Sequence, residues 1–233
     1  MDRFYFLELL WKGAGSIPAP KRNRITEVKP AAHLAALGEY VEMTRMTAYG
    51  QLLDIRNGTL PVPEVTEADV LTVHKLKSAL YTVVGPLSIG ALLGRRTRAS
   101  LRDLRAVASD LGVAFQLRDD VLGAGFDAEA AGKSSNDLIE GKRTLLVIHA
   151  WQQGTDDDRA ALTRVLGNPK SSVSEVERAK DAIRSSGSLE YSERRIRELT
   201  DRALHRLERS DQIPKARKGL VREIGDRLVR RKS

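Results

Sequence analysis

The sequence contains no cysteine, which excludes disulfide frameworks, thiol catalysis and cysteine metal sites. Aromatic residues make up only 5% of the 233 residues and hairpin dipeptides hardly occur, so little in the sequence predicts β-strands. No apolar run is long enough to span a bilayer, and the mean hydropathy is −0.34. We therefore expect a soluble, cytoplasmic protein without an integral membrane segment.

Positive charge exceeds negative charge, because 39 Lys and Arg residues face 31 Asp and Glu residues and leave a net charge of +8. Such a surplus favours anionic partners: diphosphates, nucleic acids or acidic lipid headgroups. Residues 215–233 place cations among apolar side chains and predict an amphipathic basic helix. We interpret it as a packed terminal helix with a solvated cationic face rather than a membrane or nucleic-acid contact, so no nucleic-acid partner is expected.

Leu, Ala, Val and Ile recur at three- and four-residue spacings, which predicts an all-α protein. Pro61, Pro63 and Gly85-Pro86 mark breaks between periodic segments. No linker is long enough to require a second domain, so residues 1–233 are predicted to form a single helical domain. The predicted helices cover residues 2–12, 29–56, 66–83, 86–94, 99–122, 136–152, 156–166, 172–185, 187–209 and 214–230.

Acids, lysines and glycines are dense between residues 115 and 145. Asp119 and Asp120 stand together at the predicted C-terminal end of an apolar helix, where they oppose each other and the negative end of the helix dipole. Mg²⁺ typically takes one or two carboxylates and completes its shell with water and phosphate oxygens. Lys133 and Lys142 follow, and ammonium groups would neutralise the remaining phosphate oxygens. An isolated acid pair would be a solvated corner, but this pattern predicts a Mg²⁺-bound diphosphate.

Residues 115–123, FQLRDDVLG, resemble the second aspartate-rich motif of the trans-polyprenyl diphosphate synthases. That family's pattern continues through a Gly-Lys pair and an acid to an E-G-K-x-T segment. Gly132-Lys133, Asp137 and residues 140–144 stand in those places. The order and the spacing both agree with the family.

Two upstream segments are similar to further family motifs. Residues 74–82, HKLKSALYT, resemble its Lys-Thr-Ala-x-Tyr segment with Ser78 in place of Thr, and residues 50–54, GQLLD, resemble its Gly-Gln-x-x-Asp helix. The resemblance implies an isoprenoid synthase-type helical bundle around a deep apolar pocket. It also implies site roles: Lys77, Ser78 and Gln116 as catalytic residues, Lys77, Lys133 and Lys142 as diphosphate-binding residues, Gln51 and Asp54 as cavity-lining residues, and Asp119 and Asp120 as Mg²⁺ ligands.

Two features depart from the family pattern. Gly123 stands where the family's fuller motif has a third Asp, and no first aspartate-rich motif precedes these segments. The chain is therefore interpreted as an N-terminally truncated synthase that resembles the C-terminal two-thirds of the family. Asp156-Asp157-Asp158 is an equally dense acidic run, but it is predicted to cap the start of a helix.

The resemblance implies a role in isoprenoid biosynthesis, as a prenyltransferase that condenses an allylic diphosphate with isopentenyl diphosphate and uses Mg²⁺. Because the first aspartate-rich motif, which would form the opposite metal-binding wall, has no counterpart here, we expect this chain alone to turn over its two diphosphate substrates poorly. The alternative is a non-catalytic subunit of a complete synthase. The family's tendency to pair implies a homodimer or a heteromer with a complete synthase. The four histidines, His33, His74, His149 and His205, share no metal-binding spacing and are predicted to be packing or surface residues.

Overall fold

The computed structural model describes residues 29–126 and 136–229, and every regular element in these two ranges is helical. The predicted helix over residues 2–12 lies outside them. The elements are α2 (Pro30–Thr59), η2 (Val62–Glu64), α3 (Glu67–Val73), η3 (His74–Val84), α4 (Gly85–Leu93), η4 (Ala99–Leu101), α5 (Arg102–Gly123), α6 (Asn136–Ile139), α7 (Leu145–Gln153), α8 (Asp156–Val165), α9 (Val173–Ser185), α10 (Ser188–Arg209) and α11 (Lys215–Val229).

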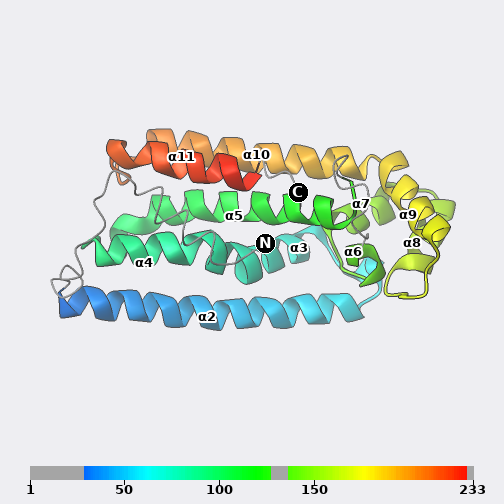
Figure 1. Ribbon diagram of the computed structural model, residues 1–233, viewed down its shortest axis with the longest axis horizontal. Coiled ribbons are helices and arrows are strands. Elements are labelled where there is room, and N and C mark those ends of the chain that lie inside the picture. The colour runs from blue at the N-terminus through cyan, green and yellow to red at the C-terminus, as the bar shows by residue number, and fades with distance from the viewer. Residues whose placement is uncertain (1–28, 127–135, 230–233) are drawn as a thin grey trace.

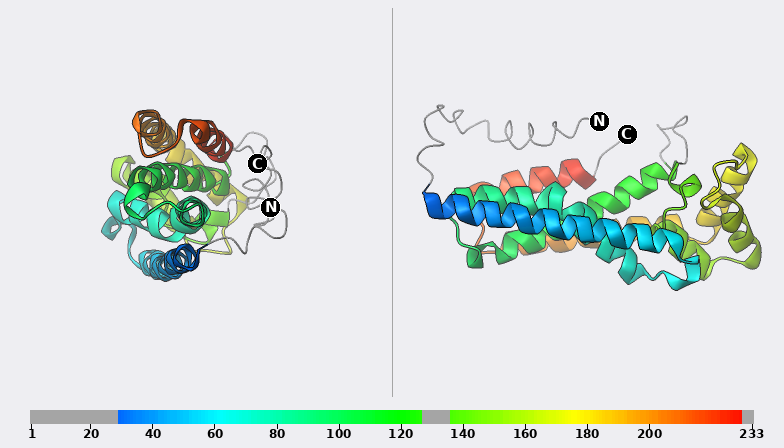
Figure 2. Two further views of the ribbon diagram at one scale, coloured as in Figure 1. Left: turned by 90° about the vertical axis from the view of Figure 1, so that its left-hand side faces the viewer. Right: turned by 90° about the horizontal axis from the view of Figure 1, so that it is seen from below.

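The long helices lie roughly parallel to the long axis of the molecule (Figure 1). α5 packs between η3 and α10, α2 packs against η3 and α4, and α11 covers part of α5 and α10. The short helices α8 and α9 pack together at one end of the bundle, while α2 forms one edge of it (Figure 2). Among the described residues, α2 has neighbours on one side only, and Leu34, Val41 and Leu52 on its other side are exposed.

The helical path does not break at Gly85-Pro86, where the sequence predicted an interruption. The chain stays helical from Glu67 to Leu93 because η3 is wound as a π-helix, in which the N–H of Gly85 donates to the carbonyl oxygen of Leu80, five residues earlier. Pro86, which has no N–H to donate, follows this π-wound stretch as the second residue of α4.

This continuous helix, Glu67–Leu93, is long and apolar enough to cross a membrane by length and composition alone. The core helix of a bundle passes the same test, and η3 packs against both α2 and α5 with Ala79 and Val83 fully buried. The absence of an integral membrane segment stays a prediction.

The predicted helix over residues 136–152 is two helices, α6 and α7, joined by a turn. Gly141 ends α6 with φ of +73°, a left-handed conformation that favours glycine. A Cβ on Gly141 would also lie 2.9 Å from the backbone nitrogen of Gly167. Thr144 then caps α7, because its side chain accepts a hydrogen bond from the N–H of Val147 at 3.4 Å.

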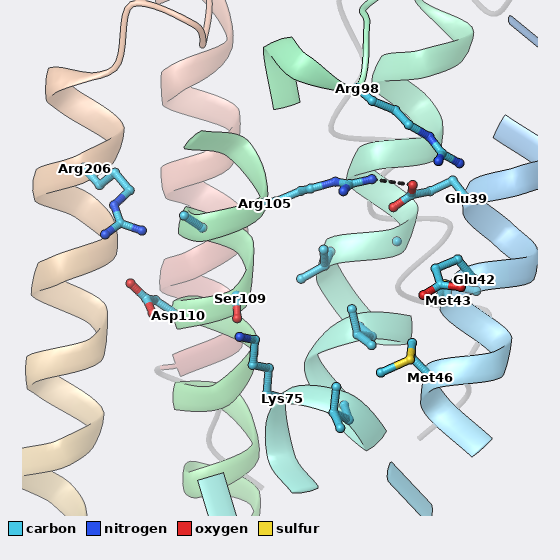
Figure 3. Close-up of a pocket in the computed structure, with 15 residues that line it drawn as sticks. Glu39, Glu42, Met43, Met46, Lys75, Arg98, Arg105, Ser109, Asp110 and Arg206 are labelled. Atoms are coloured by element: carbon cyan, nitrogen blue, oxygen red, sulfur yellow. Dashed lines mark hydrogen bonds and ion pairs between the residues drawn. The ribbon is translucent and has the colours of Figure 1, made fainter. Parts of the chain in front are cut away.

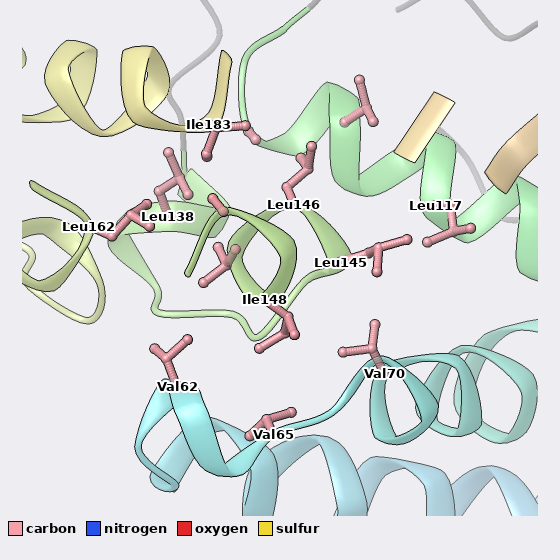
Figure 4. Close-up of a cluster of buried hydrophobic side chains, with 14 of the residues drawn as sticks. Val62, Val65, Val70, Leu117, Leu138, Leu145, Leu146, Ile148, Leu162 and Ile183 are labelled. Atoms are coloured by element: carbon pink, nitrogen blue, oxygen red, sulfur yellow. The ribbon is translucent and has the colours of Figure 1, made fainter. Parts of the chain in front are cut away.

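The largest hydrophobic cluster surrounds α7, whose residues 145–148 are all buried. Side chains from η2, α3, α5, α6, α8 and α9 pack around this helix (Figure 4). Among the largest buried side chains of the cluster are Leu117, Leu138, Leu145, Leu146, Ile148, Leu162 and Ile183. The cluster therefore ties the C-terminal end of α5 to the α6–α7 turn.

The acidic run Asp156-Asp157-Asp158 opens α8, as the sequence predicted. Thr155 is the N-cap, and its hydroxyl accepts from the N–H of Asp158 at 3.2 Å while the Asp158 carboxylate accepts from the N–H of Thr155 at 2.9 Å. This capping box, together with the helix dipole, explains the three acids.

His149 joins α7 to α10. Its ring stacks on Tyr191 with centroids 4.1 Å apart, and its Nδ1 lies 2.9 Å from the hydroxyl oxygen of Ser188. Burial and the positive charge of Arg194 lower the pKa of His149, and the negative charge of Glu67 offsets part of this effect. The folded protein therefore favours the neutral imidazole.

We expect the free energy of unfolding to fall as the pH drops below about 6.5, because the unfolded His149 then binds a proton that the folded protein resists. Above that pH the contribution is fully present. Urea unfolding at several pH values should show a weaker dependence in the His149→Phe variant, which keeps the ring stack. The exposed His33 on α2 provides the control variant His33→Gln, and equal slopes in all three proteins would contradict the assignment.

Candidate functional site

Lys77 of η3 forms an ion pair with Asp54 of α2, two residues that come from different sequence motifs. Gly50 makes this contact possible, because a Cβ there would lie 2.5 Å from the backbone nitrogen of Lys77 and 2.8 Å from the carbonyl carbon of Leu76. The two helix backbones therefore touch at Gly50, one turn before Asp54. This close approach gives a physical reason for the glycine in the Gly-Gln-x-x-Asp segment.

Asp120 is buried at the C-terminal end of α5, with 5% of its surface exposed. Its Oδ1 accepts a hydrogen bond from the side-chain amide of Gln116 at 3.0 Å. Its Oδ2 lies 2.9 Å from Nε2 of the buried His74 of η3, in a geometry that does not form a hydrogen bond. Both oxygens of Asp120 therefore face protein groups, and His74, which the sequence pattern gave no role, lies in the site.

Asp137 and Lys142 form an ion pair across the turn that ends α6. The backbone N–H of Lys142 also donates to the carbonyl oxygen of Asp137 at 3.0 Å, so the Gly141 turn folds Lys142 back over Asp137. Arg143 fixes the turn by donating to the carbonyl oxygens of Gly141 at 2.7 Å and Leu60 at 2.8 Å. Thr144 caps α7, so residues 141–144 each make a contact or adopt a conformation that shapes this turn.

The pKa values of the pair reflect burial first and the neighbouring charges second. Burial raises the pKa of Asp137, the bond to Lys142 offsets part of the rise, and the charges of Asp120 and Glu140 add to it. Burial opposes charge on Lys142, but its bond to Asp137 and the nearby carboxylates outweigh burial and raise its pKa. The influence of Asp120 on Asp137 indicates that α5 and α6 bring their acids to the same region.

Gly123 leaves the space that Asp137 occupies. A Cβ built on Gly123 would meet Oδ2 of Asp137 closer than any real Cβ contact. The carboxylate of Asp137 therefore lies beside α5 one turn beyond Asp119 and Asp120, where the family's third motif acid would start. Asp137 thus places a carboxylate close to the position at which the family motif has its third Asp.

The predicted site residues have different surroundings. Asp119 is partly exposed at the end of α5, Ser78 is buried in η3, and Gln51 is exposed on α2. Lys133 lies outside the described residues. Three clusters therefore lie in sequence. Lys77, which pairs with Asp54 of α2, shares η3 with His74, and His74 lies 2.9 Å from Asp120 of α5. Asp137, which pairs with Lys142, lies beside Gly123 at the end of the same α5.

The acids fit a hard divalent cation that shares its shell with a ligand. Within residues 29–126 and 136–229, no three acidic or histidine side chains are arranged as a complete metal cage. Mg²⁺ needs no such cage, since it usually binds through one or two carboxylates with water and phosphate oxygens. The adjacent carboxylates of Asp119 and Asp120, with the Asp137 carboxylate beside Gly123 at the end of the same helix, suit Mg²⁺ together with a diphosphate.

Comparisons with known proteins identify the family of the chain. The polyprenyl synthetase family model matches residues 23–183. The geranylfarnesyl diphosphate synthase of Aeropyrum pernix is 32% identical over 82% of this chain and 57% of its own length. The octaprenyl diphosphate synthase of Escherichia coli is 32% identical over 72% of this chain and 51% of its own length. The chain thus spans about half the length of the curated relatives it matches.

A solved structure shares the fold. The crystal structure of geranylgeranyl pyrophosphate synthase from Corynebacterium glutamicum, complexed with isoprenyl diphosphate and magnesium, is 29% identical and superimposes with a TM-score of 0.77. The match covers 88% of this chain and 57% of that one. The expected all-α, isoprenoid synthase-type bundle is confirmed over the matched part.

Proposed function

The chain belongs to the polyprenyl synthetase family, and on that premise we propose that it binds an allylic diphosphate with Mg²⁺ and serves in its condensation with isopentenyl diphosphate. The family acts in isoprenoid biosynthesis, and we propose a cytoplasmic location for this member. The observation that carries the proposal is the order of neighbours from Lys77 and His74 on η3, through Asp120, to the Asp137–Lys142 pair beside Gly123 at the end of α5. These residues supply the two charge classes that a metal diphosphate needs.

The two adjacent acids have different environments, which supports different roles. Asp120 is buried and its oxygens face Gln116 and His74, so it would act on the metal through its charge or through water. Asp119 is partly exposed and would offer its carboxylate directly. Gln116 and His74 are then positioning residues for Asp120.

Departure of the diphosphate is the costly step of the proposed reaction, because negative charge develops on the leaving group as the allylic carbon–oxygen bond breaks. When bound, Mg²⁺ supplies positive charge at the departing diphosphate oxygens. Lys77 and Lys142 would donate hydrogen bonds to oxygens that the metal leaves uncovered, and Ser78 lies next to Lys77. Asp54 and Asp137 hold the two ammonium groups in position through ion pairs.

We expect the 233-residue polypeptide alone to turn over allylic and isopentenyl diphosphates far more slowly than about 1 per second, a common lower value for enzymes. The reason is that the 233 residues contain one aspartate-rich motif, whereas the family pattern has two. Removal of a single charge-stabilising element commonly costs about two to three powers of ten in rate. A steady-state assay with Mg²⁺ checks this expectation. Turnover near 1 per second would show that one acidic wall is sufficient.

A second candidate function is that of a subunit that pairs with another synthase chain. The observation that favours it is an apolar stripe on the exposed side of α2, formed by Leu34, Leu37, Val41, Leu52 and Ile55, each more than half exposed. These residues recur at helical spacing over most of α2. An exposed apolar face of this extent is typical of an interface, so we propose that α2 pairs with a second copy or with a complete synthase.

We expect the wild-type chain to associate, and the double variant Leu37→Lys/Leu52→Lys to shift towards monomer, because two charges would be buried in the apolar contact. Size-exclusion chromatography with light scattering measures the shift. Val173→Lys is the matched control, since Val173 is 81% exposed on α9, away from α2. A wild-type monomer alone and in the presence of a complete synthase would contradict the proposed interface.

A further inference from the structure

A cavity lies between α2, η3 and α5 (Figure 3). None of the predicted site residues lines it. Its volume is 510 Å³, within the range of small-molecule sites. Lys75 lines this cavity, whereas Lys77, two residues later on the same helix, pairs with Asp54 in the candidate diphosphate site. Substitutions of Lys75 and Lys77 therefore test two different sites, the cavity and the candidate diphosphate site.

The three acids that line the cavity are already neutralised. Each of them pairs with an arginine in the folded protein. Glu39 pairs with Arg105, Glu42 with Arg45 at 2.7 Å, and Asp110 with Arg202 at 2.7 Å. Each cavity acid thus already has an arginine partner, and Arg98 adds further positive charge near Glu42.

Three lining cations remain without a partner of this kind. Within the described ranges, Lys75, Arg98 and Arg206 form no ion pair. Lys75 extends towards Ser109 of α5 (Figure 3). The Nε of Arg105, whose terminal nitrogen bonds Glu39, is buried and has no hydrogen-bond acceptor in the described structure. The cavity is therefore a positively charged hollow with donors that lack acceptors.

The remaining wall is apolar. It consists of methionine and aliphatic side chains from α2 and η3, namely Met43, Met46, Leu76, Leu80 and Val84. Methionine side chains are flexible and polarizable and adapt to varied apolar ligands. An anion that carried a hydrocarbon chain would match both parts of the lining.

We propose that this cavity binds an amphiphilic phosphate, a phosphoryl headgroup on a short hydrocarbon chain. Lys75 and Ser109 contact the headgroup, and the hydrocarbon chain lies along Met43, Met46 and Leu80. Arg98 and Arg206 balance its remaining charge. A phosphate monoester suits the cation surplus better than a carboxylate, because it carries nearly two negative charges at neutral pH. The site is independent of the proposed diphosphate site and needs no metal.

The test is isothermal titration of the full chain with octyl phosphate in the presence of EDTA, compared with inorganic phosphate and the uncharged octyl glucoside. Octyl phosphate is expected to bind at least tenfold more tightly than either control. Lys75→Gln is expected to weaken that binding tenfold or more, and Ser109→Ala to weaken it less. Lys77→Gln is the matched control on the same helix and should leave octyl phosphate binding unchanged while it weakens Mg²⁺-dependent diphosphate binding.

Two arms identify the natural source of such a ligand. Geranyl phosphate represents the isoprenoid source and a lysophosphatidate represents the glycerolipid source; tighter binding of either, sensitive to Lys75→Gln, supports the site and names the source. The proposal is overturned if octyl phosphate fails to bind without metal. It is also overturned if Lys77→Gln abolishes binding and Lys75→Gln does not, because the ligand would then occupy the diphosphate site.

Discussion

The Asp119→Asn variant is expected to bind a non-hydrolysable allylic diphosphate analogue about 100-fold more weakly than wild type in the presence of Mg²⁺. Asp119 is the partly exposed acid of the pair, so the substitution removes a carboxylate from the metal without disturbing the contacts of Asp120 with Gln116 and His74. Isothermal titration with and without Mg²⁺ measures the loss.

The matched control for this prediction is Asp157→Asn. Asp157 is an exposed acid in the first turn of α8 and belongs to the other dense acidic run of the sequence. Its replacement is expected to leave binding unchanged. If Asp157→Asn weakened binding and Asp119→Asn did not, the metal would have been assigned to the wrong acidic run.

The Gly50→Ala variant is expected to lose about 1–3 kcal/mol of unfolding free energy, the usual cost of overpacking a tight contact. The added Cβ would lie 2.5 Å from the backbone nitrogen of Lys77, an atom that cannot rotate away, so α2 must move off η3. That movement also separates Asp54 from Lys77, and diphosphate binding should weaken with the loss of stability.

Gly58→Ala serves as the control, because Gly58 lies on the same helix and a Cβ there meets nothing within 4 Å. Alanine is the better helix former, so this substitution is expected to leave stability unchanged or to raise it by up to about 1 kcal/mol. Urea unfolding compares the two variants. Equal stability of Gly50→Ala and Gly58→Ala would show that the α2–η3 contact is looser than described.

The helical fold was predictable because apolar side chains recur with helical spacing along most of the chain. Val107, Leu111 and Ala114 illustrate this, since they lie about one turn apart on α5 and are all buried. The continuation through Gly85-Pro86 was not predictable from local signals. Proline normally marks a break, whereas here the i→i+5 bonding of η3 runs directly up to Pro86 and the chain stays helical.

Part of the site was predictable for a related reason. Asp119, Asp120 and Lys142 stand in motifs whose residue types match the chemistry. His74 was missed because its contact with Asp120 depends on how η3 is wound and packed against α5, which leaves no mark at the histidine itself. The cation surplus of the cavity was equally hidden, since Lys75, Arg98 and Arg206 line one cavity only in three dimensions.

The central claim is that the acids of α5 and the lysines of η3 and the α6–α7 turn surround one diphosphate. Anomalous diffraction from crystals soaked with Mn²⁺ and a non-hydrolysable allylic diphosphate analogue tests it most directly. The account predicts a manganese peak next to Asp119 and diphosphate oxygens within hydrogen-bond reach of Lys77 and Lys142. Manganese at the start of α8, or a diphosphate bound away from both lysines, would contradict it.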